Sequence, residues 1–390
     1  MAAPVDPPAY RKHDPPPTLR YEDYTIGWIS ALPEEAEAAT HMLDDRDNGR
    51  FPFRPGDDNQ YTPGEIAGHK VVIACLPKRT TGTVSAATLV SQMRQSFPNL
   101  RYGLMVGIGA GVPGQNLDPD IRLGDVVVAS PSDISDSPVG VIGYELGAET
   151  VDGFKRRDWQ APTDRRLRNA LESIERDARV EGSHDFLQHL KIFVGRNHGQ
   201  KFRHPDVEDQ LYKGDDTDEL VPRQPRLPQD PAVHYGLIAS GNKLVKKAEL
   251  RDALRDKYGI ICFEMEAAGL MNIMPVAVIR GVSDYADSRK NDVWHCYAAA
   301  TAAAYAKGLL NVIGPESPAR NDLGRGVEPP GDRVRVLKRL RVNGVGFLRR
   351  CGDGSVGSEY VEFVDAFVYG RVRVNIAGYM DYSRIKVEDL

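Results

Sequence analysis

The stretch YGLMVGIGAG, residues 102–111, decides the fold that we expect for this chain. Its first half, 102–106, is a continuous apolar run, which predicts a strand that is buried on both faces of a sheet. Its second half, 107–111, has the spacing GxGxG and predicts a tight turn at which the backbone closely approaches another group. A turn without any ligand is the alternative interpretation of this segment.

The glycine spacing does not predict a dinucleotide-binding loop. Val112 occupies the place of the third glycine, Pro113 introduces a turn where a helix would have to begin, and the lysine of a phosphate-binding P-loop is missing. A close backbone approach at the end of a strand is therefore all that the segment predicts.

Apolar runs of the same kind recur along the chain, and segments of helical character separate them. The expected strands cover 24–29, 70–76, 102–106, 123–129, 235–239, 260–263 and 276–280, and the expected helices cover 83–96, 165–179, 266–272 and 294–310, with a further helix that begins at Pro33. This alternation predicts an α/β fold with a central mixed, twisted sheet and helices on both of its faces.

The chain divides into three parts by composition. Residues 1–20 contain six prolines and predict a disordered leader, and residues 24–314 carry the regular pattern, which a polar insertion at about 150–232 interrupts. Residues 315–390 begin as a Pro- and Gly-rich linker and continue as a basic tail, to which we assign no fold, although the last forty residues could form a small β-structure.

The composition also excludes several classes of function. The 390 residues include 50 Lys and Arg and 55 Asp and Glu, a balance that argues against a nucleic-acid binder driven by bulk charge. The basic run 333–350 could still contact phosphates, and an exposed tail is the alternative. No uninterrupted apolar segment is long enough to span a membrane. Residues 1–20 lack the apolar region of a signal peptide, so we do not expect secretion. The four cysteines form no CxxC pair, so we expect a cytoplasmic protein.

Carboxylates gather where the expected strands end. Glu264 and Glu266 flank Met265 between a strand and a helix, and paired carboxylates can accept hydrogen bonds from the two hydroxyls of a ribose. Asp284 follows another strand and could act as a general acid. Glu34 and Glu35 follow the first strand. Each of these acids alone could instead serve as a helix-end or turn residue, but their coincidence favours an active site.

At these residues the chain resembles the purine and uridine phosphorylase superfamily, and within it the methylthioadenosine/S-adenosylhomocysteine nucleosidase branch. The matching pieces, which follow the family order, are IGWISALPEE (26–35), GIGAG (107–111) with LGDVV (123–127), FEMEAA (263–268) and Ser283-Asp284. The chain is similar in particular to nucleosidase domains of fungal NOD-like receptor proteins of the innate immune system. The resemblance implies a nucleoside phosphorylase-like fold.

The resemblance also implies a reaction, the cleavage of the N-glycosidic bond of a purine nucleoside or nucleotide, with adenine as the base. Asp284 would protonate N7 of the purine, and Glu35 would activate the attacking water. Glu266, supported by Glu264 and Met265, would hold the ribose hydroxyls. No cofactor is implied, and homo-oligomers are common in the family, with a neighbouring subunit completing the pocket for the 5′ end of the substrate.

Two departures from the family's phosphorylases favour hydrolysis over phosphorolysis. Those enzymes resemble this chain but carry Gly-Asp-Pro-x-Arg after the first strand, where residues 31–35 read ALPEE. They also offer a hydroxyl to phosphate in the glycine segment, where this chain has Ile108. A phosphate-dependent phosphorylase and a non-catalytic nucleotide sensor are the alternatives.

A basic loop suggests what the 5′ end of the substrate carries. Lys78, Arg79, Thr80 and Thr81 follow the second strand, and cations beside hydroxyls are common at phosphate sites. Since the superfamily includes members that cleave the base from ATP, we hypothesise a 5′-phosphorylated adenine nucleotide, with a solvated loop as the alternative. The remaining candidates for substrate contacts are Ile108, Gly109 and Asn242, the last standing where relatives usually carry Asp.

Further basic side chains, at Arg122, Arg196, Lys201, Arg203 and His204, are secondary candidates for binding a 5′ phosphate. The histidines at 184 and 189 are five residues apart and therefore miss one helical face, so we expect no metal site.

Overall fold

A computed structural model describes residues 17–131, 139–157, 160–195, 199–226 and 230–315, together with three strands nearer the C-terminus. The chain separates into two compact units, Met1–Ala319 and Arg320–Leu390. In the second unit, β13 (Phe347–Gly352), β14 (Glu359–Asp365) and β15 (Val368–Arg373) form an antiparallel sheet in that order. Most of the predicted leader and the basic run up to residue 346 lie outside the described residues.

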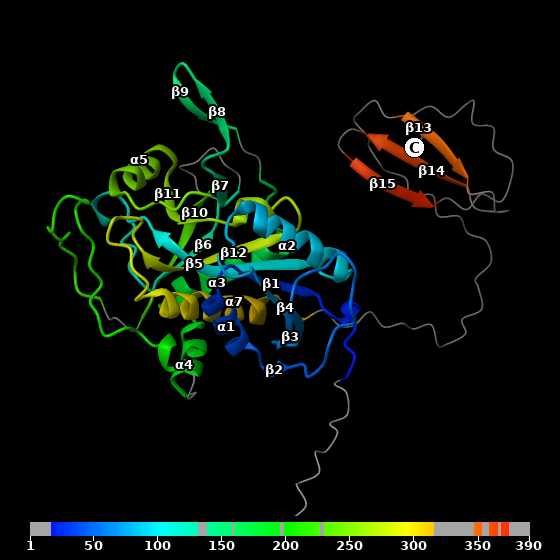
Figure 1. The fold of residues 1–390 in the computed structure, drawn as a ribbon, viewed down its shortest axis with the longest axis horizontal. Helices are drawn as coiled ribbons and strands as arrows, with labels where there is room; N and C mark the ends of the chain where they lie inside the picture. Colours follow the sequence, from blue (N-terminus) through cyan, green and yellow to red (C-terminus); the bar gives the residue numbers. More distant parts are fainter. Residues whose placement is uncertain are drawn as a thin grey trace, which may run out of the picture. The chain divides into compact units, whose positions relative to one another are not determined.

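A ten-stranded mixed sheet forms the centre of the first unit (Figure 1), in the order β11-β10-β6-β12-β5-β1-β4-β3-β2, with β7 paired to β10. The strands are β1 (Ile26–Ser30), β2 (Asp45–Arg46), β3 (Tyr61–Ile66), β4 (His69–Cys75), β5 (Tyr102–Gly111), β6 (Val126–Ala129), β7 (Val141–Gly143), β10 (Val233–Ser240), β11 (Ile260–Glu264) and β12 (Val276–Asp284). Strands β4, β1, β5 and β12 run parallel. Because β11 also pairs with β5, strands β11, β10, β6, β12 and β5 close on themselves.

Strand β5 corrects the predicted glycine turn, since the strand continues through residues 107–111. The glycines are required by close packing rather than by a bend. A Cβ atom on Gly107 would lie 2.3 Å from Oε1 of Glu35, and one on Gly109 would lie 2.7 Å from Sγ of Cys262. The predicted close approach is thus real, but the approaching groups are side chains of the same protein.

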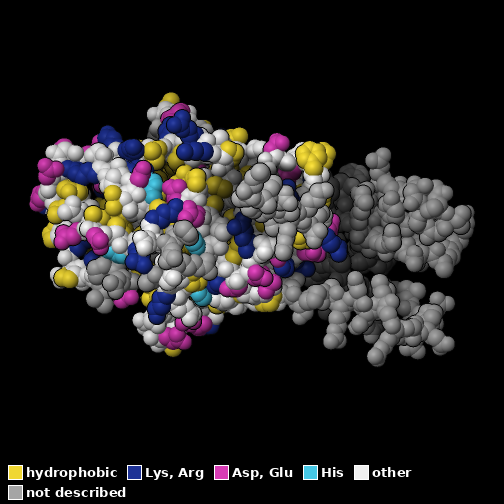
Figure 2. Space-filling view, turned by 60° about the horizontal axis from the view of Figure 1, so that its bottom comes forward, with side chains coloured by type: hydrophobic (Ala, Val, Ile, Leu, Met, Phe, Trp, Pro, Cys, Tyr) yellow, Lys and Arg dark blue, Asp and Glu magenta, His cyan; other side chains and the backbone are white. Residues whose placement is uncertain are grey.

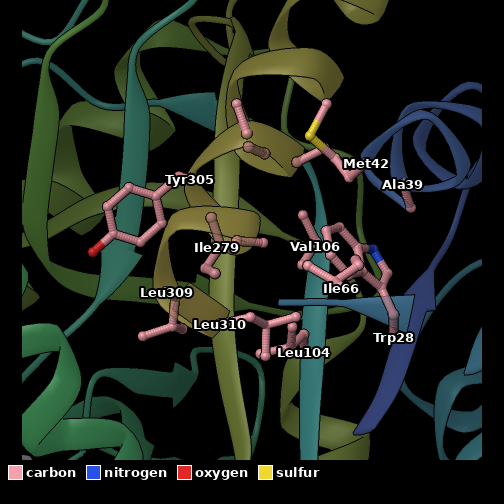
Figure 3. Packing of buried hydrophobic residues seen from close by; sticks show 14 of the residues in the cluster. Trp28, Ala39, Met42, Ile66, Leu104, Val106, Ile279, Tyr305, Leu309 and Leu310 are labelled. Carbon is pink, nitrogen blue, oxygen red and sulfur yellow. The ribbon is translucent and has the colours of Figure 1, made fainter. Parts of the chain in front are cut away.

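Helices cover both faces of the sheet, as predicted. One face carries α1 (Pro33–Met42), α3 (Arg165–Glu181), α4 (Leu187–Gly195) and α7 (His295–Ile313), and the other carries α2 (Thr83–Ser96) and α6 (Ala267–Leu270). Helix α5 (Ala248–Tyr258) packs against β11. In Figure 3, side chains of α1 and α7 meet Trp28, Val106 and Ile279 from the sheet.

The alanine-rich α7 lies unusually close to the sheet. A Cβ atom on Gly281 of β12 would be only 1.8 Å from the carbonyl oxygen of Ala298, so the two backbones are in direct contact. Side chains at Ala298–Ala304 are buried. Small residues on both sides allow this approach, which brings helix and strand together without intervening side chains.

The insertion contains more regular structure than the sequence predicts. The hairpin of β8 (Gly147–Thr150) and β9 (Gly153–Arg156) projects from the body of the first unit in Figure 1. The predicted helix at 165–179 is present as α3, whereas α4 was not predicted; its Phe193 packs against His41 and Phe202. Between η3 (Gln200–Phe202) and β10, the described residues belong to no helix or named strand.

The described surface carries both signs of charge, and Figure 2 shows Lys and Arg side chains interspersed with Asp and Glu. In the part of the chain that the structure describes, no helix has the length and apolarity needed to cross a bilayer.

Candidate active site

The predicted carboxylates converge because the strands that precede them are neighbours. Strands β1 and β12 both run parallel to β5, so their carboxyl ends lie at one edge of the sheet. Glu35 follows β1 in the first turn of α1, and Asp284 is the last residue of β12. Strand β11, which ends at Glu264, pairs with the distal end of β5. The structure therefore brings three of the predicted strand ends to one place.

Glu35 is buried and holds three backbone N–H groups. Its Oε2 accepts hydrogen bonds from the N–H of Ala31 at 2.7 Å and of Leu32 at 3.0 Å, and its Oε1 accepts one from the N–H of Ile108 at 2.8 Å. Burial raises the pKa of Glu35, although Arg280 and these N–H groups oppose the shift. The carboxylate is thus fixed in orientation and has an increased affinity for a proton. The neighbouring Glu34 instead pairs with His295, at 3.5 Å.

A fully buried arginine, which the sequence analysis missed, lies among these acids. The guanidinium of Arg280, in β12, forms an ion pair with Glu264 and lies 3.6 Å from Oε2 of Glu266. Its Nε and Nη1 atoms have no hydrogen-bond acceptor among the described residues. A charged residue within the apolar run VAVIRGV was the available sequence signal, because an arginine is almost never fully buried unless it is paired.

Glu264 and Glu266 have different surroundings. Glu264 accepts hydrogen bonds from the backbone N–H of Glu266 at 3.0 Å and of Ala267 at 2.9 Å, in addition to its ion pair with Arg280, so it holds the start of α6. Glu266 accepts one from the N–H of Gly82, at 3.1 Å. Burial raises the pKa of Glu266 to about 7, while Arg280 opposes and Glu264 adds to the shift. Met265, between them, is half-buried.

Asp284 is buried, and three donors hold its carboxylate. Oδ1 accepts a hydrogen bond from the N–H of Ala286 at 3.0 Å, and Oδ2 accepts one from the hydroxyl of Ser283 at 2.9 Å. Lys290, which the sequence analysis also missed, forms an ion pair with Oδ2. Asp284 therefore makes a turn, which was the alternative to a catalytic role, and three donors fix the orientation of its carboxylate.

The predicted basic loop is joined to this site at one end. Lys78 and Arg79 are exposed, and Thr80 closes a turn by donating its N–H to the carbonyl of Pro77 at 2.9 Å, while Thr81 is exposed. Two residues further, Gly82 donates to Glu266. The loop from 78 to 82 therefore begins at the surface and ends at the buried carboxylates.

Asn242 lies beside this loop. Its side-chain oxygen accepts hydrogen bonds from the N–H of Thr83 at 2.9 Å and from the hydroxyl of the same residue at 3.1 Å. The contact fixes the start of α2, and it leaves little room, since a Cβ atom on Gly82, whose φ is +96°, would lie 2.6 Å from the same oxygen. Asn242 thus lies beside the loop that reaches Glu266, and its predicted contact with substrate stays a prediction.

The sequence profile of the phosphorylase superfamily matches residues 25–311, which is most of the first unit. The chain belongs to this superfamily. It is 41% identical over 311 residues to a nucleotide-binding leucine-rich repeat (NLR)-like protein of Hyaloscypha variabilis. That match covers 77% of this chain and 30% of the relative, so the chain spans less than a third of the relative's length.

Two other relatives of this superfamily member are named as nucleosidases. One, the 5′-methylthioadenosine/S-adenosylhomocysteine nucleosidase of Mycobacterium bovis, is 23% identical over 301 residues, which cover 74% of this chain and 96% of the relative. The other, the ATP nucleosidase Cap17 of Escherichia coli, is 36% identical over 77 residues, 18% of this chain and 15% of the relative. The resemblance predicted from residues 26–35, 263–268 and 283–284 is confirmed.

Three of the other basic candidates of this phosphorylase-superfamily member, Arg122, Lys201 and His204, contact other side chains of the chain. Arg122 pairs with Asp120 at 2.6 Å, and Lys201 pairs with Glu37 at 2.5 Å. His204 packs against the ring of Trp294, and Arg196 lies outside the described residues. Among the residues that the structure describes, no three His, Cys, Asp or Glu side chains are grouped as metal ligands.

Proposed function

We propose that this chain is a purine nucleosidase that hydrolyses the N-glycosidic bond of an adenine nucleoside or nucleotide. The observation that carries the proposal is the placement of two fixed carboxylates along one strand. Glu35 binds the N–H of Ile108, and Asp284 is in register with Ala110, two residues further along β5. Two residues of a strand span about 7 Å. This spacing is that of the backbone positions to which the two residues are tied, and it brings an acid and a base to neighbouring positions at the end of β5.

Asp284 and Glu35 act on different parts of the reaction, the leaving base and the attacking water. Asp284 donates a proton to N7 of the purine, which makes the base a neutral leaving group as the C1′–N9 bond breaks. Glu35 takes a proton from the water whose oxygen forms the new bond to C1′. The negative charge of the buried carboxylates stabilises the positive charge that develops on the sugar.

Three further residues hold the substrate and the water. Glu266 accepts hydrogen bonds from the ribose hydroxyls, and Met265 lies against the sugar. The buried Nε and Nη1 atoms of Arg280 are available to donate to the water or to a hydroxyl. Glu264 acts indirectly, because its carboxylate holds Arg280 and the start of α6.

The environment of Glu35 supports hydrolysis over phosphorolysis. The N–H of Ile108, which could otherwise donate to an anion, is occupied by Glu35, and Glu34 adds a second carboxylate to the same turn. Phosphate would be repelled there, whereas water would not. The two relatives named as nucleosidases also support this choice.

Release of free adenine tests the function directly. The chain is incubated with adenosine, AMP, ATP and methylthioadenosine, with and without phosphate. We expect adenine and free ribose, or its 5′-substituted form, at a rate that phosphate does not raise. Ribose 1-phosphate among the products would identify a phosphorylase, and binding without release of adenine would identify a nucleotide sensor.

We further propose that the substrate carries a 5′ phosphate, as ATP does, and that Lys78 and Arg79 bind it. Both side chains are exposed on the loop that ends at Glu266, and neither forms an ion pair within the described part of the chain. A relative named as an ATP nucleosidase supports this choice. A role in innate immunity and a homo-oligomer that completes the 5′ pocket stay predictions.

Replacing both residues, as Lys78→Ala with Arg79→Ala, should lower kcat/KM for ATP about 10-fold or more, because charge-assisted contacts contribute about 1.5–3 kcal/mol each. The value for adenosine should be unchanged. A matched control is Arg176→Ala with Arg179→Ala, which removes two exposed cations from α3. Equal losses on ATP and adenosine, or an equal loss in the control, would contradict phosphate binding by the loop.

A further inference from the structure

Residues of the insertion form hydrogen bonds with the segment that follows Asp284. The catalytic roles proposed above do not explain these contacts. Residues 209–223, which we call the anchor loop, are irregular in structure and contact residues 285–289. Residues 285–289 lie between Asp284 and Lys290, the two members of the buried ion pair. The anchor loop is therefore placed to control the geometry of that pair.

The first anchor is a buried cluster around Tyr285. Its hydroxyl donates to Oδ1 of Asp209 at 2.5 Å and accepts from Nη1 of Arg223 at 2.7 Å, while the same guanidinium pairs with Asp209 at 2.8 Å. The guanidinium carbon of Arg223 lies 5.2 Å from the centre of the Tyr285 ring. From α5, Arg251 donates to the carbonyl of Tyr285 at 3.0 Å. Both the side chain and the carbonyl oxygen of Tyr285 are thus held.

The second anchor holds the residues just before Lys290. Asp215 accepts a hydrogen bond from the N–H of Ser288 at 2.8 Å. The guanidinium of Arg289 donates to the carbonyls of Gly214 at 3.1 Å and Thr217 at 2.7 Å, and lies 3.9 Å from the centre of the Tyr212 ring. These contacts fix the backbone at Ser288 and the side chain of Arg289, the two residues that precede Lys290.

Between the two anchors lies a residue whose backbone conformation requires support. Ala286 is buried and has a φ of +54°, in the left-handed region that costs a non-glycine residue about 1–2 kcal/mol. Its N–H donates to Oδ1 of Asp284 at 3.0 Å. Surrounding contacts must therefore hold Ala286 in this conformation, and if it relaxed, the hydrogen bond to Asp284 would be lost.

We propose that the anchor loop positions Asp284 for catalysis, with Tyr285, Asp209, Arg223 and Arg289 as the positioning residues. This inference rests on the proposed function. The loop holds Tyr285 and Arg289, which directly precede Ala286 and Lys290 in the chain, and Ala286 and Lys290 both bind the Asp284 carboxylate. The insertion thus serves the protonation of the leaving base, and the four positioning residues act through Ala286 and Lys290.

The test is Tyr285→Phe, which removes one hydroxyl and keeps the ring. Its matched control is Tyr235→Phe, since the hydroxyl of Tyr235 also bonds a side chain, that of Tyr305 at 3.0 Å, outside the site. We expect kcat on adenosine to fall about 10–100-fold in Tyr285→Phe with little change in KM, as small displacements of catalytic groups cost rates of this order. The control should lose a similar amount of thermal stability and keep its kcat.

A second substrate separates positioning of the acid from a general loss of structure. The leaving group of 4-nitrophenyl β-D-ribofuranoside needs no proton, so its hydrolysis should be retained in Tyr285→Phe. Arg289→Ala, in which a partly exposed side chain is removed, should show the same selective loss if Tyr285→Phe does not fold. A kcat on adenosine equal to that of the wild type, or parallel losses on the two substrates, would overturn the positioning role. Absence of adenine release by the wild-type chain would instead contradict the proposed function.

Discussion

Asp284→Asn is expected to lower kcat for adenosine by about 10²–10⁴-fold, the usual contribution of a general acid or base. An asparagine keeps the size of the side chain and can still accept from the N–H of Ala286, but it cannot transfer a proton to N7. Hydrolysis of 4-nitrophenyl β-D-ribofuranoside should survive, because its leaving group departs as an anion. Steady-state rates on the two substrates measure this difference.

Asp44→Asn is the matched control for this prediction. Asp44 also pairs with a buried lysine, Lys307, and accepts a backbone N–H, that of Ala67 at 2.7 Å, but it lies outside the site. The control should lose stability without losing activity. A wild-type kcat for adenosine in Asp284→Asn would show that another group protonates the base.

Arg280→Met is expected to have the largest effect on stability. It leaves Glu264 and Glu266 buried beside Glu35 without their cation, and breaking a buried ion pair in this way costs about 3–5 kcal/mol. That loss is a large part of the total of about 5–15 kcal/mol that a typical domain has. Urea unfolding followed by circular dichroism would measure it.

The loss should depend on pH in a defined direction. In the wild type the pKa of Glu266 is raised from 4.5 to about 7, so the folded state binds more protons than the unfolded state between these values. Stability therefore falls as the pH rises from about 4.5 to about 7. Removing the guanidinium takes away the group that opposes this shift, so in Arg280→Met the fall should be larger and extend to higher pH, and the stability deficit should be smallest in acid.

A neutral version of the cluster is the control. Combining Arg280→Met with Glu264→Gln and Glu266→Gln removes the charges together, and this triple variant should regain much of the lost stability and lose most of the pH dependence. If Arg280→Met were equally destabilised at about pH 5 and about pH 8, the cost would come from packing rather than from unpaired carboxylates.

The fold could be predicted largely from local patterns, because most strands of the sheet follow from apolar runs. Strands β2 and β3, which carry charged residues and Pro63, were not predicted. The conformation of the glycine-containing residues 107–111 could not be predicted in this way. A glycine is required at position 107 because the side chain of Glu35, which is 72 positions earlier in the chain, lies against it. The sequence of residues 102–111 alone does not indicate this contact. Helix α4 was missed for a similar reason, since Phe193 packs against side chains from other segments.

The acids of the site could be predicted because they follow strands whose ends meet. Their cations could not be assigned in the same way. Arg280 had a signal, its charge within an apolar strand, whereas Lys290 stands in a polar segment, where a lysine is ordinarily solvated. Asn242 could be placed near the site, but its bond to Thr83 depends on a loop more than 150 positions away.

Because α7 and β12 are in direct contact, we expect the helix and the strand to move as one rigid body. No flexible side chain separates Gly281 from Ala298, so a displacement of the helix passes to the strand that carries Arg280 and Asp284 without being absorbed. Helix α1, which carries Glu35, packs on the same helix. A force applied at α7, by a neighbouring domain or a bound protein, would therefore shift the acid and the base together and preserve the spacing between them.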